Sequence, residues 1–154
     1  MQTFVYINKA TADDLAEIAG AEALCFSDAW SESSVLSQIS SHYGLTVVAK
    51  DGDGKFLGYV CGSVCPPECE IFRVLTLPEH RRAGVARKMI LEFVRLANAR
   101  ECEDFFIEVR ESNIAARSLY ASLGFSEIGK RKGYYSMPRE DAVLLSAKMK
   151  ANAQ

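Results

Sequence analysis

The stretches RRAGVA (residues 81–86) and EVRESN (residues 108–113) organise the rest of the sequence. The first follows an apolar run that stops at Pro78, and it opens a long segment with apolar residues at helical spacing. The second continues an alternating strand-like run, and Tyr120 follows Asn113 by seven residues. The first stretch offers the unpaired N–H groups of a helix start, and the second supplies a carboxylate and, with Tyr120, a phenol. No other part of the chain has as many groups that could bind a ligand or take part in a reaction.

The periodicity around these stretches predicts an α/β (α+β) fold, with a mixed central sheet of about seven strands and four helices. The expected strands cover residues 3–8, 45–50, 56–64, 70–77, 104–110, 126–132 and 141–149. The expected helices cover residues 12–24, 31–43, 84–100 and 113–123, and residues 133–140 are expected to form a loop. Strand, helix and strand follow one another over residues 70–110, which requires a right-handed parallel crossover, so the sheet is mixed.

Length and composition indicate one domain, residues 1–154, with a substantial hydrophobic core. The chain has 154 residues, of which 49% are hydrophobic. On the helix expected at 84–100, an apolar stripe is predicted to face this core, and it consists of Val85, Met89, Phe93, Leu96 and Ala97.

The net charge is small, but the charged residues are unevenly placed. A formal charge of −2 argues against a nucleic-acid-binding surface spread over the protein, and no direct nucleic-acid binding is expected. Residues 10–49 contain no Lys or Arg but carry Asp13, Asp14, Glu17, Glu22, Asp28 and Glu32. Basic residues cluster from Arg73 onward. Two ligands, one cationic and one anionic, would suit this asymmetry, and ordinary solvated helix faces would explain it equally well.

The cysteines and the N-terminus favour a cytoplasmic protein with reduced thiols. Five cysteines are an odd number, and the start Met-Gln-Thr-Phe-Val-Tyr-Ile-Asn lacks the basic and long apolar regions of a secretion signal. No apolar run approaches the ~20 residues that span a bilayer, so no membrane association is expected. No metal site is expected either, because Cys61, Cys65 and Cys69 lack the C-x2-C spacing of zinc sites.

The first stretch has the features of a pyrophosphate site. Gly84 lies where the backbone must turn tightly, and the small Ala86 leaves room for a ligand at the helix start. The helix dipole favours an anion there, and positive charge is added by Arg81, Arg82, Arg87 and Lys88. Only one glycine of the G-x-G-x-x-G pattern is present, and the P-loop pattern is absent. A capped basic helix without a ligand would show the same features.

Glu108 and Tyr120 are candidates for a general base and a general acid. Glu108 lies between two apolar residues of a strong strand, where a charge is costly unless it has a partner or a role. A salt bridge, for example to Arg110 on the same face, would also explain it. Tyr120 lies on a helix with Leu123 three residues on, so a core tyrosine is an equally open interpretation.

Together these segments resemble the Gcn5-related N-acetyltransferase (GNAT) superfamily. The R-x-x-G-x-A segment at 81–86 resembles its acetyl-coenzyme A pyrophosphate loop, and residues 113–125 resemble its N-x-x-A…L-Y…G-F helix. More narrowly, four segments are similar to the bacterial ribosomal-protein alanine N-acetyltransferases of the RimI type, namely AWSE (29–32), IEVRESN (107–113), GYY (133–135) and REDA (139–142). The match covers most of the chain and implies the GNAT fold.

The resemblance implies catalytic and cofactor-binding roles at the matching positions. Glu108 would be the general base, acting through water on the substrate ammonium, and Tyr120 the general acid that returns a proton to the coenzyme A thiolate. The pantetheine arm and thioester carbonyl of acetyl-coenzyme A would be held by backbone groups of Val74, Leu75 and Thr76. The pyrophosphate would lie on Arg82, Ala83, Gly84, Val85, Ala86 and Arg87. Asn113 would contact another part of the cofactor.

The resemblance also implies an acceptor, the N-terminal alanine of a small-subunit ribosomal protein. The residues that would flank the peptide are Trp30, Glu32, Tyr134 and Tyr135. An α-amino group has a pKa of about 7.7–8.0, so near neutrality a modest base suffices, and direct attack in a ternary complex needs no covalent enzyme intermediate. The acidic segment 10–49 suits a basic protein N-terminus.

Two departures from the family pattern bear on the acceptor. Arg73 stands where the family commonly has Asn, with Val74-Leu75-Thr76 in place of Ile-Ala-Val, and the loop before Arg139 is shorter. Two other functions are therefore open. One is an acetyltransferase for lysine side chains or small amines, and the other is a coenzyme A-binding module without turnover, against which the presence of both Glu108 and Tyr120 argues.

Overall fold

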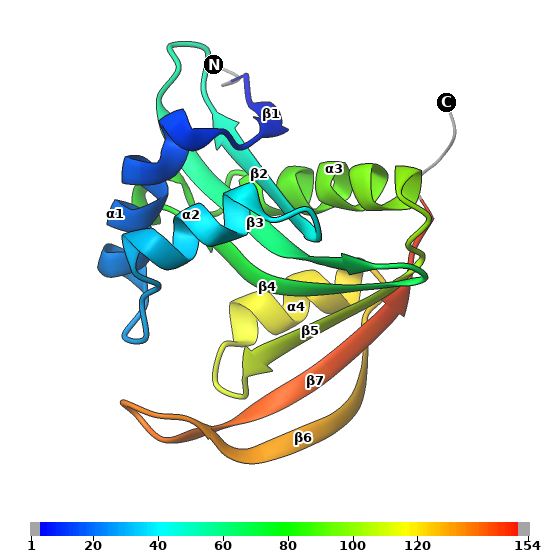
Figure 1. Cartoon of the computed structure of the whole chain (residues 1–154). Coiled ribbons are helices and arrows are strands. Elements are labelled where there is room, and N and C mark those ends of the chain that lie inside the picture. The colour runs from blue at the N-terminus through cyan, green and yellow to red at the C-terminus, as the bar shows by residue number, and fades with distance from the viewer. Residues whose placement is uncertain (1–3, 151–154) are drawn as a thin grey trace.

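The computed structural model describes residues 4–150 as a seven-stranded sheet flanked by helices (Figure 1). The strands are β1 (Tyr6–Lys9), β2 (Gly44–Lys50), β3 (Phe56–Cys65), β4 (Glu68–Thr76), β5 (Asp104–Arg110), β6 (Ser126–Tyr135) and β7 (Glu140–Lys148). The helices are α1 (Leu15–Cys25), α2 (Glu32–Ser40), α3 (Val85–Ala99) and α4 (Ile114–Ser122), with 3-10 turns at Ala12–Asp14 and Pro78–His80. The strand order is β1-β2-β3-β4-β5-β7-β6, and only β4 and β5 pair in parallel. The predicted mixed sheet and the helix count are confirmed for the described residues.

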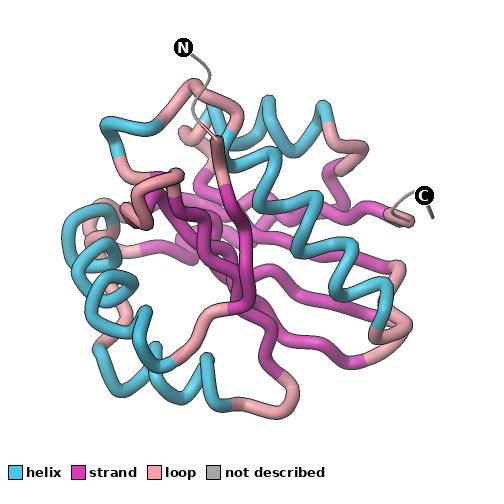
Figure 2. The backbone as a smooth tube through the Cα atoms, turned by 90° about the horizontal axis from the view of Figure 1, so that it is seen from above, coloured by secondary structure: helices cyan, strands magenta, loops and turns pink. Residues whose placement is uncertain are grey.

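Helices cover both faces of the sheet (Figures 1 and 2), and a hydrophobic core lies on each face. The larger core lies on the α3 side and includes the predicted stripe, of which Val85, Met89, Phe93 and Ala97 are buried and Leu96 is partly buried. The smaller core lies under α1 and α2, where the buried residues include Ile18, Val35, Tyr59 and Leu75. The face of β5 that carries Phe105, Ile107 and Val109 belongs to the larger core. Glu108, between them in sequence, therefore faces away from α3.

Three element boundaries near the N-terminus differ from the expectation. Helix α1 begins at Leu15, because residues 12–14 of the expected helix form a 3-10 turn. Strand β1 covers Tyr6–Lys9 rather than residues 3–8, and Thr3 lies outside the described residues. Helix α2 ends at Ser40 rather than near residue 43, because the backbone at Ser41 is extended (φ −70°, ψ 133°) ahead of β2. These changes move no predicted site residue.

The boundary of β6 changes the setting of two candidate residues. Strand β6 continues to Tyr135, so Tyr134 and Tyr135 belong to a strand and not to the expected loop 133–140. The ladder with β7 is interrupted after Arg131 and resumes where Tyr135 pairs with Glu140. Gly133 has φ 62° in this interruption, and such a residue lets the strand bend without ending.

Strands β4 and β5 pair over only part of their length. Residues 68–71 of β4 pair with residues 104–107 of β5, and beyond that point the strands separate (Figure 1). The ladder between β3 and β4 shifts at the same level, because Ile71 pairs with Gly62 and Arg73 with Cys61, which leaves Phe72 as an extra residue. The centre of the sheet therefore has an opening bounded by backbone edges of β4 and β5.

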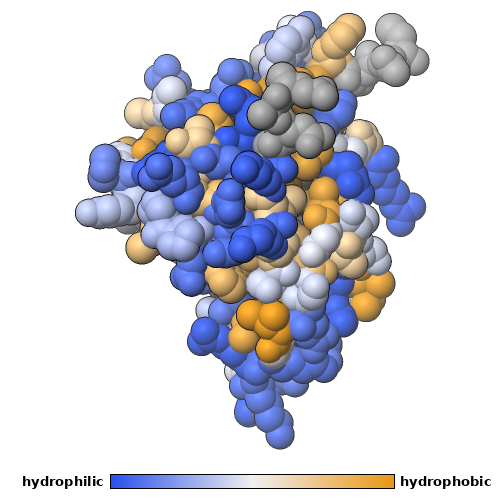
Figure 3. All heavy atoms as spheres, turned by 90° about the vertical axis from the view of Figure 1, so that its right-hand side faces the viewer, coloured by the Kyte–Doolittle hydropathy of each residue, from blue (hydrophilic) through white to orange (hydrophobic). Residues whose placement is uncertain are grey.

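The surface beside the C-terminal end of the described chain is mixed. Viewed from the right-hand side of Figure 1, hydrophilic residues predominate, and apolar side chains form separate patches among them (Figure 3). Single exposed apolar residues are normal on a folded protein. This face therefore gives no indication of a function.

Candidate active site

The start of α3 keeps its first N–H groups outside the helical ladder. The N-cap Gly84 has φ 77°, and no side chain caps the helix. The first backbone hydrogen bond runs from the Lys88 N–H to the Gly84 carbonyl (3.2 Å). A Cβ added at Gly84 would meet nothing within 4 Å. Glycine is therefore favoured here because the backbone has a positive φ, and not because a side chain would clash. These free N–H groups and the helix dipole form a site that suits an anion.

The basic residues around this helix start differ in what they contact. Arg81 donates from Nε to the Thr76 carbonyl (3.1 Å), and Arg87 donates to the Ser122 hydroxyl on α4. The side chains of Arg82 and Lys88 are exposed and make no hydrogen bond or ion pair with the part of the chain that the structure describes. Arg82 and Lys88 are therefore cations near the helix start that have no partner within residues 4–150.

The strand that leads to this helix start carries unpaired polar groups. Thr76 Oγ1 is buried and has no hydrogen-bond partner among residues 4–150. Beyond Ile71, the edge of β4 that faces β5 has no strand partner either. An elongated ligand with amide and carbonyl groups would satisfy these groups, and a phosphate at its end would reach the start of α3. Residues 74–76 and 82–87 thus fit the acetyl-coenzyme A expected there.

Asn113 has a structural role that the sequence did not suggest. Its Oδ1 accepts a hydrogen bond from the Ala116 N–H (3.2 Å) and caps helix α4. A side-chain cap of this kind stabilises the helix start. Its contact with the cofactor stays a prediction.

Glu108 is half-buried on β5 and has an ion-pair partner that the sequence did not predict. Its Oε1 lies 3.2 Å from Nε of Arg131 on β6. The expected partner, Arg110, instead forms an ion pair with Glu140 (3.4 Å) and reaches the turn after β6. The alternative of a salt bridge at Glu108 is therefore confirmed, but its partner is Arg131 and not Arg110, which contacts Glu140 and the turn after β6 instead.

Tyr120 is a buried residue of the larger core. Its ring contacts Phe125 edge-on, with the centroids 5.9 Å apart. Burial, with a smaller contribution from Tyr135, raises the pKa of the Tyr120 hydroxyl well above its usual range. That hydroxyl makes no hydrogen bond within residues 4–150. A phenol in this setting keeps its proton at neutral pH.

A cavity of about 290 Å³, here called the aromatic cavity, opens where β4 and β5 separate. It is lined by Asp28, Trp30, Glu70, Ile71, Phe72, Arg73, Glu108, Tyr134, Tyr135 and Ser136. The carboxylates among these residues attract a cation, and the aromatic rings provide apolar walls and faces for cation–π contacts. A second cavity of about 410 Å³ lies beside it and shares Glu70 and Glu108 with it.

Glu108 raises the pKa values of two tyrosines on β6. Its carboxylate is the main cause that raises the pKa of Tyr134. Burial, followed by Glu108, raises the pKa of Tyr135 to about 12. Both phenols therefore stay protonated at neutral pH, beside a carboxylate that faces the aromatic cavity.

The structure brings together some of the predicted site residues and leaves others apart. Glu108, Trp30, Tyr134 and Tyr135 line one cavity, and their roles there stay predictions. Tyr120 does not line it, since it lies on the other side of the sheet with the larger core. Glu32 is exposed in the first turn of α2 and does not line it either.

Sequence reasoning missed several residues of the aromatic cavity as site residues, namely Asp28, Glu70, Phe72 and Arg73. Glu70 pairs with Phe106 on β5, two residues before Glu108. The parallel pairing of β4 with β5 would have brought Glu70 near Glu108, but the register cannot be read from the sequence. Phe72 owes its position to the shift in the β3–β4 ladder, which no sequence pattern signals.

Neither a metal cluster nor a membrane-crossing helix is found within residues 4–150. No group of three side chains that could ligate a metal occurs in the described part of the chain, and its cysteines are free thiols. No described helix has the length and apolar character needed to span a bilayer.

Comparison with known families finds a match over most of the chain. Residues 15–125 match the acetyltransferase (GNAT) family. A [ribosomal protein bS18]-alanine N-acetyltransferase of Haemophilus ducreyi is 31% identical over 120 residues, which cover 76% of this chain and 81% of that protein. The N-alpha-acetyltransferase RimI of Mycobacterium tuberculosis is 30% identical over 144 residues, covering 90% of this chain and 89% of that one.

A solved structure is also similar to this chain. The ribosomal-protein-S18-alanine N-acetyltransferase from Escherichia coli superposes with a TM-score of 0.86 at 26% identity. The superposition covers 98% of this chain and 99% of the other.

Proposed function

The chain belongs to the GNAT family of acetyltransferases, and we propose that it moves the acetyl group of acetyl-coenzyme A to the α-amino group of an N-terminal alanine. The observation that carries this proposal is Glu108, a half-buried carboxylate that lines a cavity with aromatic walls at the opening between β4 and β5. A solved structure named for alanine N-acetylation shares the fold over 98% of this chain. We treat residues 1–154 as one catalytic domain.

The donor would lie along the second half of β4 and end at the start of α3. Backbone groups of Val74, Leu75 and Thr76 would hold the pantetheine arm, with Thr76 Oγ1 as an additional partner. The N–H groups of residues 83–87 would bind the pyrophosphate, with Arg82 supplying charge. Bound acetyl-coenzyme A supplies an activated thioester. Asn113 would contact the cofactor from the start of α4 through groups that its capping bond leaves free.

Glu108 would act as the general base. An α-amino group has a pKa of about 7.7–8.0, so near neutrality a large fraction is protonated and must lose a proton before it attacks. The ammonium would enter the aromatic cavity and lose this proton to Glu108 through a water molecule. The free amine would then attack the thioester carbonyl directly, and no covalent enzyme intermediate forms.

Tyr120 would act as the general acid. The attack expels the sulfur of coenzyme A as a thiolate, which needs a proton. Burial keeps the Tyr120 hydroxyl protonated, and its lack of a partner within the described residues leaves the proton free to be donated. We propose that Tyr120 gives this proton to the thiolate from the α4 side of the opening, while Glu108 acts from the opposite face. The attacking nitrogen loses its second proton as the amide forms, and this proton returns through solvent to the Tyr120 oxygen.

The acceptor would be a protein with a basic N-terminal segment, as in a small-subunit ribosomal protein. Asp28, Glu70 and Glu108 line the aromatic cavity and favour a cation, and Trp30, Tyr134 and Tyr135 would contact the first residues. Glu32, exposed in the first turn of α2, would meet the acceptor outside the cavity. The relatives named for this activity act on ribosomal protein bS18. We propose that an enzyme with such an acceptor acts in the cytoplasm.

The test combines purified protein, acetyl-coenzyme A and a short basic peptide that begins with alanine, with product masses recorded over time. A copy with a blocked N-terminus is the control. The proposal expects one added acetyl group on the free peptide and none on the blocked copy. Acetylation of both copies would indicate a lysine acetyltransferase, and reaction of small amines alone would indicate a small-molecule enzyme. Binding of acetyl-coenzyme A without transfer to any acceptor would indicate a binding module.

A further inference from the structure

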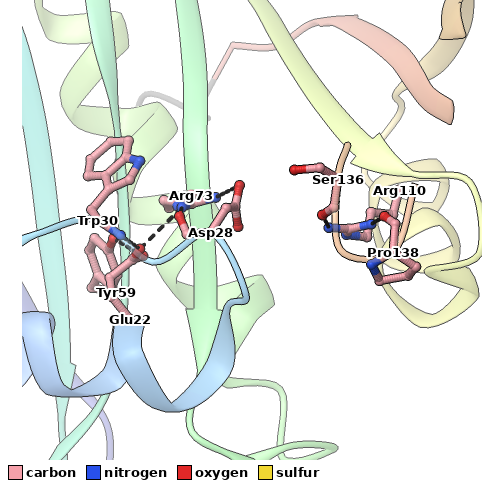
Figure 4. A network of polar contacts seen from close by, with 8 residues as sticks. All are labelled: Glu22, Asp28, Trp30, Tyr59, Arg73, Arg110, Ser136 and Pro138. Atoms are coloured by element: carbon pink, nitrogen blue, oxygen red, sulfur yellow. Dashed lines mark hydrogen bonds and ion pairs between the residues drawn. The ribbon is translucent and has the colours of Figure 1, made fainter. Parts of the chain in front are cut away.

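Arg73 and Arg110 lie on the two parallel strands that separate at the aromatic cavity. Arg73 lies on β4 and Arg110 on β5, and Figure 4 shows each among partners from a different segment. We propose that both are positioning residues, which fix the two walls of the aromatic cavity and thereby set which acceptor N-terminus it accepts. This inference rests on the proposed function, since it takes the aromatic cavity as the acceptor site.

Arg73 holds the segment between α1 and α2 at several points. Its Nη2 donates to the Asp28 carbonyl (2.9 Å), and its Nη1 lies 3.7 Å from the Asp28 carboxylate. Its Cζ lies 4.3 Å from the centre of the Phe26 ring and 5.2 Å from that of Trp30. Asp28 and Trp30 line the aromatic cavity. One guanidinium therefore joins β4 to the whole wall that residues 26–30 form.

A buried carboxylate completes this wall. Glu22 is fully buried, and its Oε1 accepts a hydrogen bond from the Trp30 N–H (2.8 Å) and lies 3.2 Å from Nη2 of Arg73. Its Oε2 accepts a hydrogen bond from the Tyr59 hydroxyl (2.6 Å). Glu22 therefore fixes the backbone of Trp30, and Arg73 supplies the counter-charge that a buried carboxylate requires.

Arg110 holds the opposite wall in the same manner. It donates from Nη1 to the Pro138 carbonyl (3.0 Å) and from Nη2 to the Ser136 carbonyl (3.2 Å). Its Cζ lies 4.4 Å from the centre of the Tyr135 ring, and Glu140 lies 3.4 Å away. Ser136 and Tyr135 line the aromatic cavity. The turn between β6 and β7 is thus fastened to β5, as the α1–α2 segment is fastened to β4.

The chemistry of arginine suits this role. A guanidinium presents several N–H donors in one plane and stacks on aromatic rings, whereas the ammonium of lysine does neither. Walls held in place give a cavity of fixed width, and a fixed width is what lets a cavity discriminate between first residues of different size. Replacing either arginine by lysine keeps the charge but releases the wall.

The kinetic test compares Arg73→Lys, Arg110→Lys and a control, Arg95→Lys, which alters an exposed arginine paired with Glu92 on α3. For each arginine of the cavity we expect the KM for the alanine-first peptide to rise about tenfold, because misplacing a binding group by about 1 Å can cost that much or more. The preference for an alanine-first over a leucine-first peptide should fall, while the KM for acetyl-coenzyme A stays at its wild-type value. In the control variant, both KM values and the peptide preference should equal those of the wild type. Equal increases in both KM values, or no change in either, would overturn the inference.

A second readout needs no turnover. Trp30 is the only tryptophan of the chain, so its fluorescence reports on this wall alone. Acrylamide should quench Trp30 more strongly in Arg73→Lys than in the wild type, and equally in Arg110→Lys and the wild type. Unchanged quenching in Arg73→Lys would overturn the inference for that wall, whichever acceptor the enzyme uses.

One further variant distinguishes the loss of the wall's contacts from the effect of leaving the Glu22 charge buried without a partner. If Arg73→Lys does not fold, Glu22→Gln combined with Arg73→Gln removes both charges and is measured in its place. The same increase in quenching is expected, and its absence would again overturn the inference. Failure of the wild type to acetylate the peptide would instead count against the proposed function.

Discussion

Nε of Arg131 lies 3.2 Å from Oε1 of Glu108, so the proposed base is held from the side of the second cavity. Arg131 also lies 5.6 Å from the centre of the Tyr134 ring, which makes one cluster of the three side chains. The Arg131 side chain is 59% exposed, so its ion pair is weakened by water and salt. An ammonium that enters the aromatic cavity can therefore compete with Arg131 for the carboxylate.

Replacing Glu108 by glutamine is expected to lower kcat about 10²–10⁴-fold, because the amide keeps the shape of the side chain but accepts no proton. Binding of acetyl-coenzyme A, measured by calorimetry, should be unchanged. The control is Glu127→Gln on β6, which removes a carboxylate at 4.0 Å from Arg117 and should keep wild-type activity. Wild-type turnover in Glu108→Gln would exclude this residue as the base.

Replacing Tyr120 by phenylalanine separates the two interpretations of this residue. The ring contact with Phe125 is retained, and the lost hydroxyl has no hydrogen bond within residues 4–150, so stability should stay within about 1 kcal/mol of the wild type. Turnover should nevertheless fall, because the proton for the thiolate is gone. A variant that is both stable and fully active would leave Tyr120 as a core residue only.

Replacing Glu22 by alanine is expected to destabilise the fold by about 3–5 kcal/mol, because it leaves the charge of Arg73 without its buried partner. Urea unfolding followed by circular dichroism measures this change. The comparison is Glu92→Ala, which breaks an exposed pair on α3 and should cost about 0.2–1 kcal/mol. Equal effects of the two substitutions would show that the buried network contributes little.

The carboxyl of Glu140 should make stability depend on acidic pH. Hydrogen bonds from Ser112, followed by the interaction with Arg110, hold the pKa of Glu140 below its usual range. A carboxyl whose pKa is lower in the folded chain stabilises the fold above the unfolded-state value of about 4.3 and loses this contribution as the pH falls below it. Urea midpoints of the wild type and Glu140→Gln should therefore differ at about pH 6 and converge toward about pH 3. A difference that is constant over this range would contradict the assignment.

The sequence predicted most of the fold because its periodicities are strong. The stripe on α3 identified the buried face of that helix, and the alternation over residues 104–110 identified β5 as a strand; both follow from side-chain spacing alone. Boundaries were less predictable where backbone conformation decides them. The extension of β6 to Tyr135 depends on a bend at Gly133 and on renewed pairing with Glu140, which local sequence does not reveal.

The site was predictable only in part, because its walls come from segments far apart in the chain. Glu108 was a candidate from its place in an apolar strand, whereas Trp30, Tyr134 and Tyr135 were identified only through a family resemblance. The partner of Glu108 was not found, since Arg131 reaches it from a strand beyond β7 in the sheet. Arg73 was noted as a departure from the family pattern, but its partners Glu22 and Asp28 lie more than 40 positions earlier in the sequence.

The measurement that tests the central claim most directly uses one basic peptide that has both a free N-terminal alanine and an internal lysine. After incubation with acetyl-coenzyme A and the enzyme, fragmentation mass spectrometry locates the acetyl group. The account predicts acetylation of the α-amine alone with the wild type and a rate lower by orders of magnitude with Glu108→Gln. An acetyl group on the lysine, or equal transfer by both proteins, would contradict it.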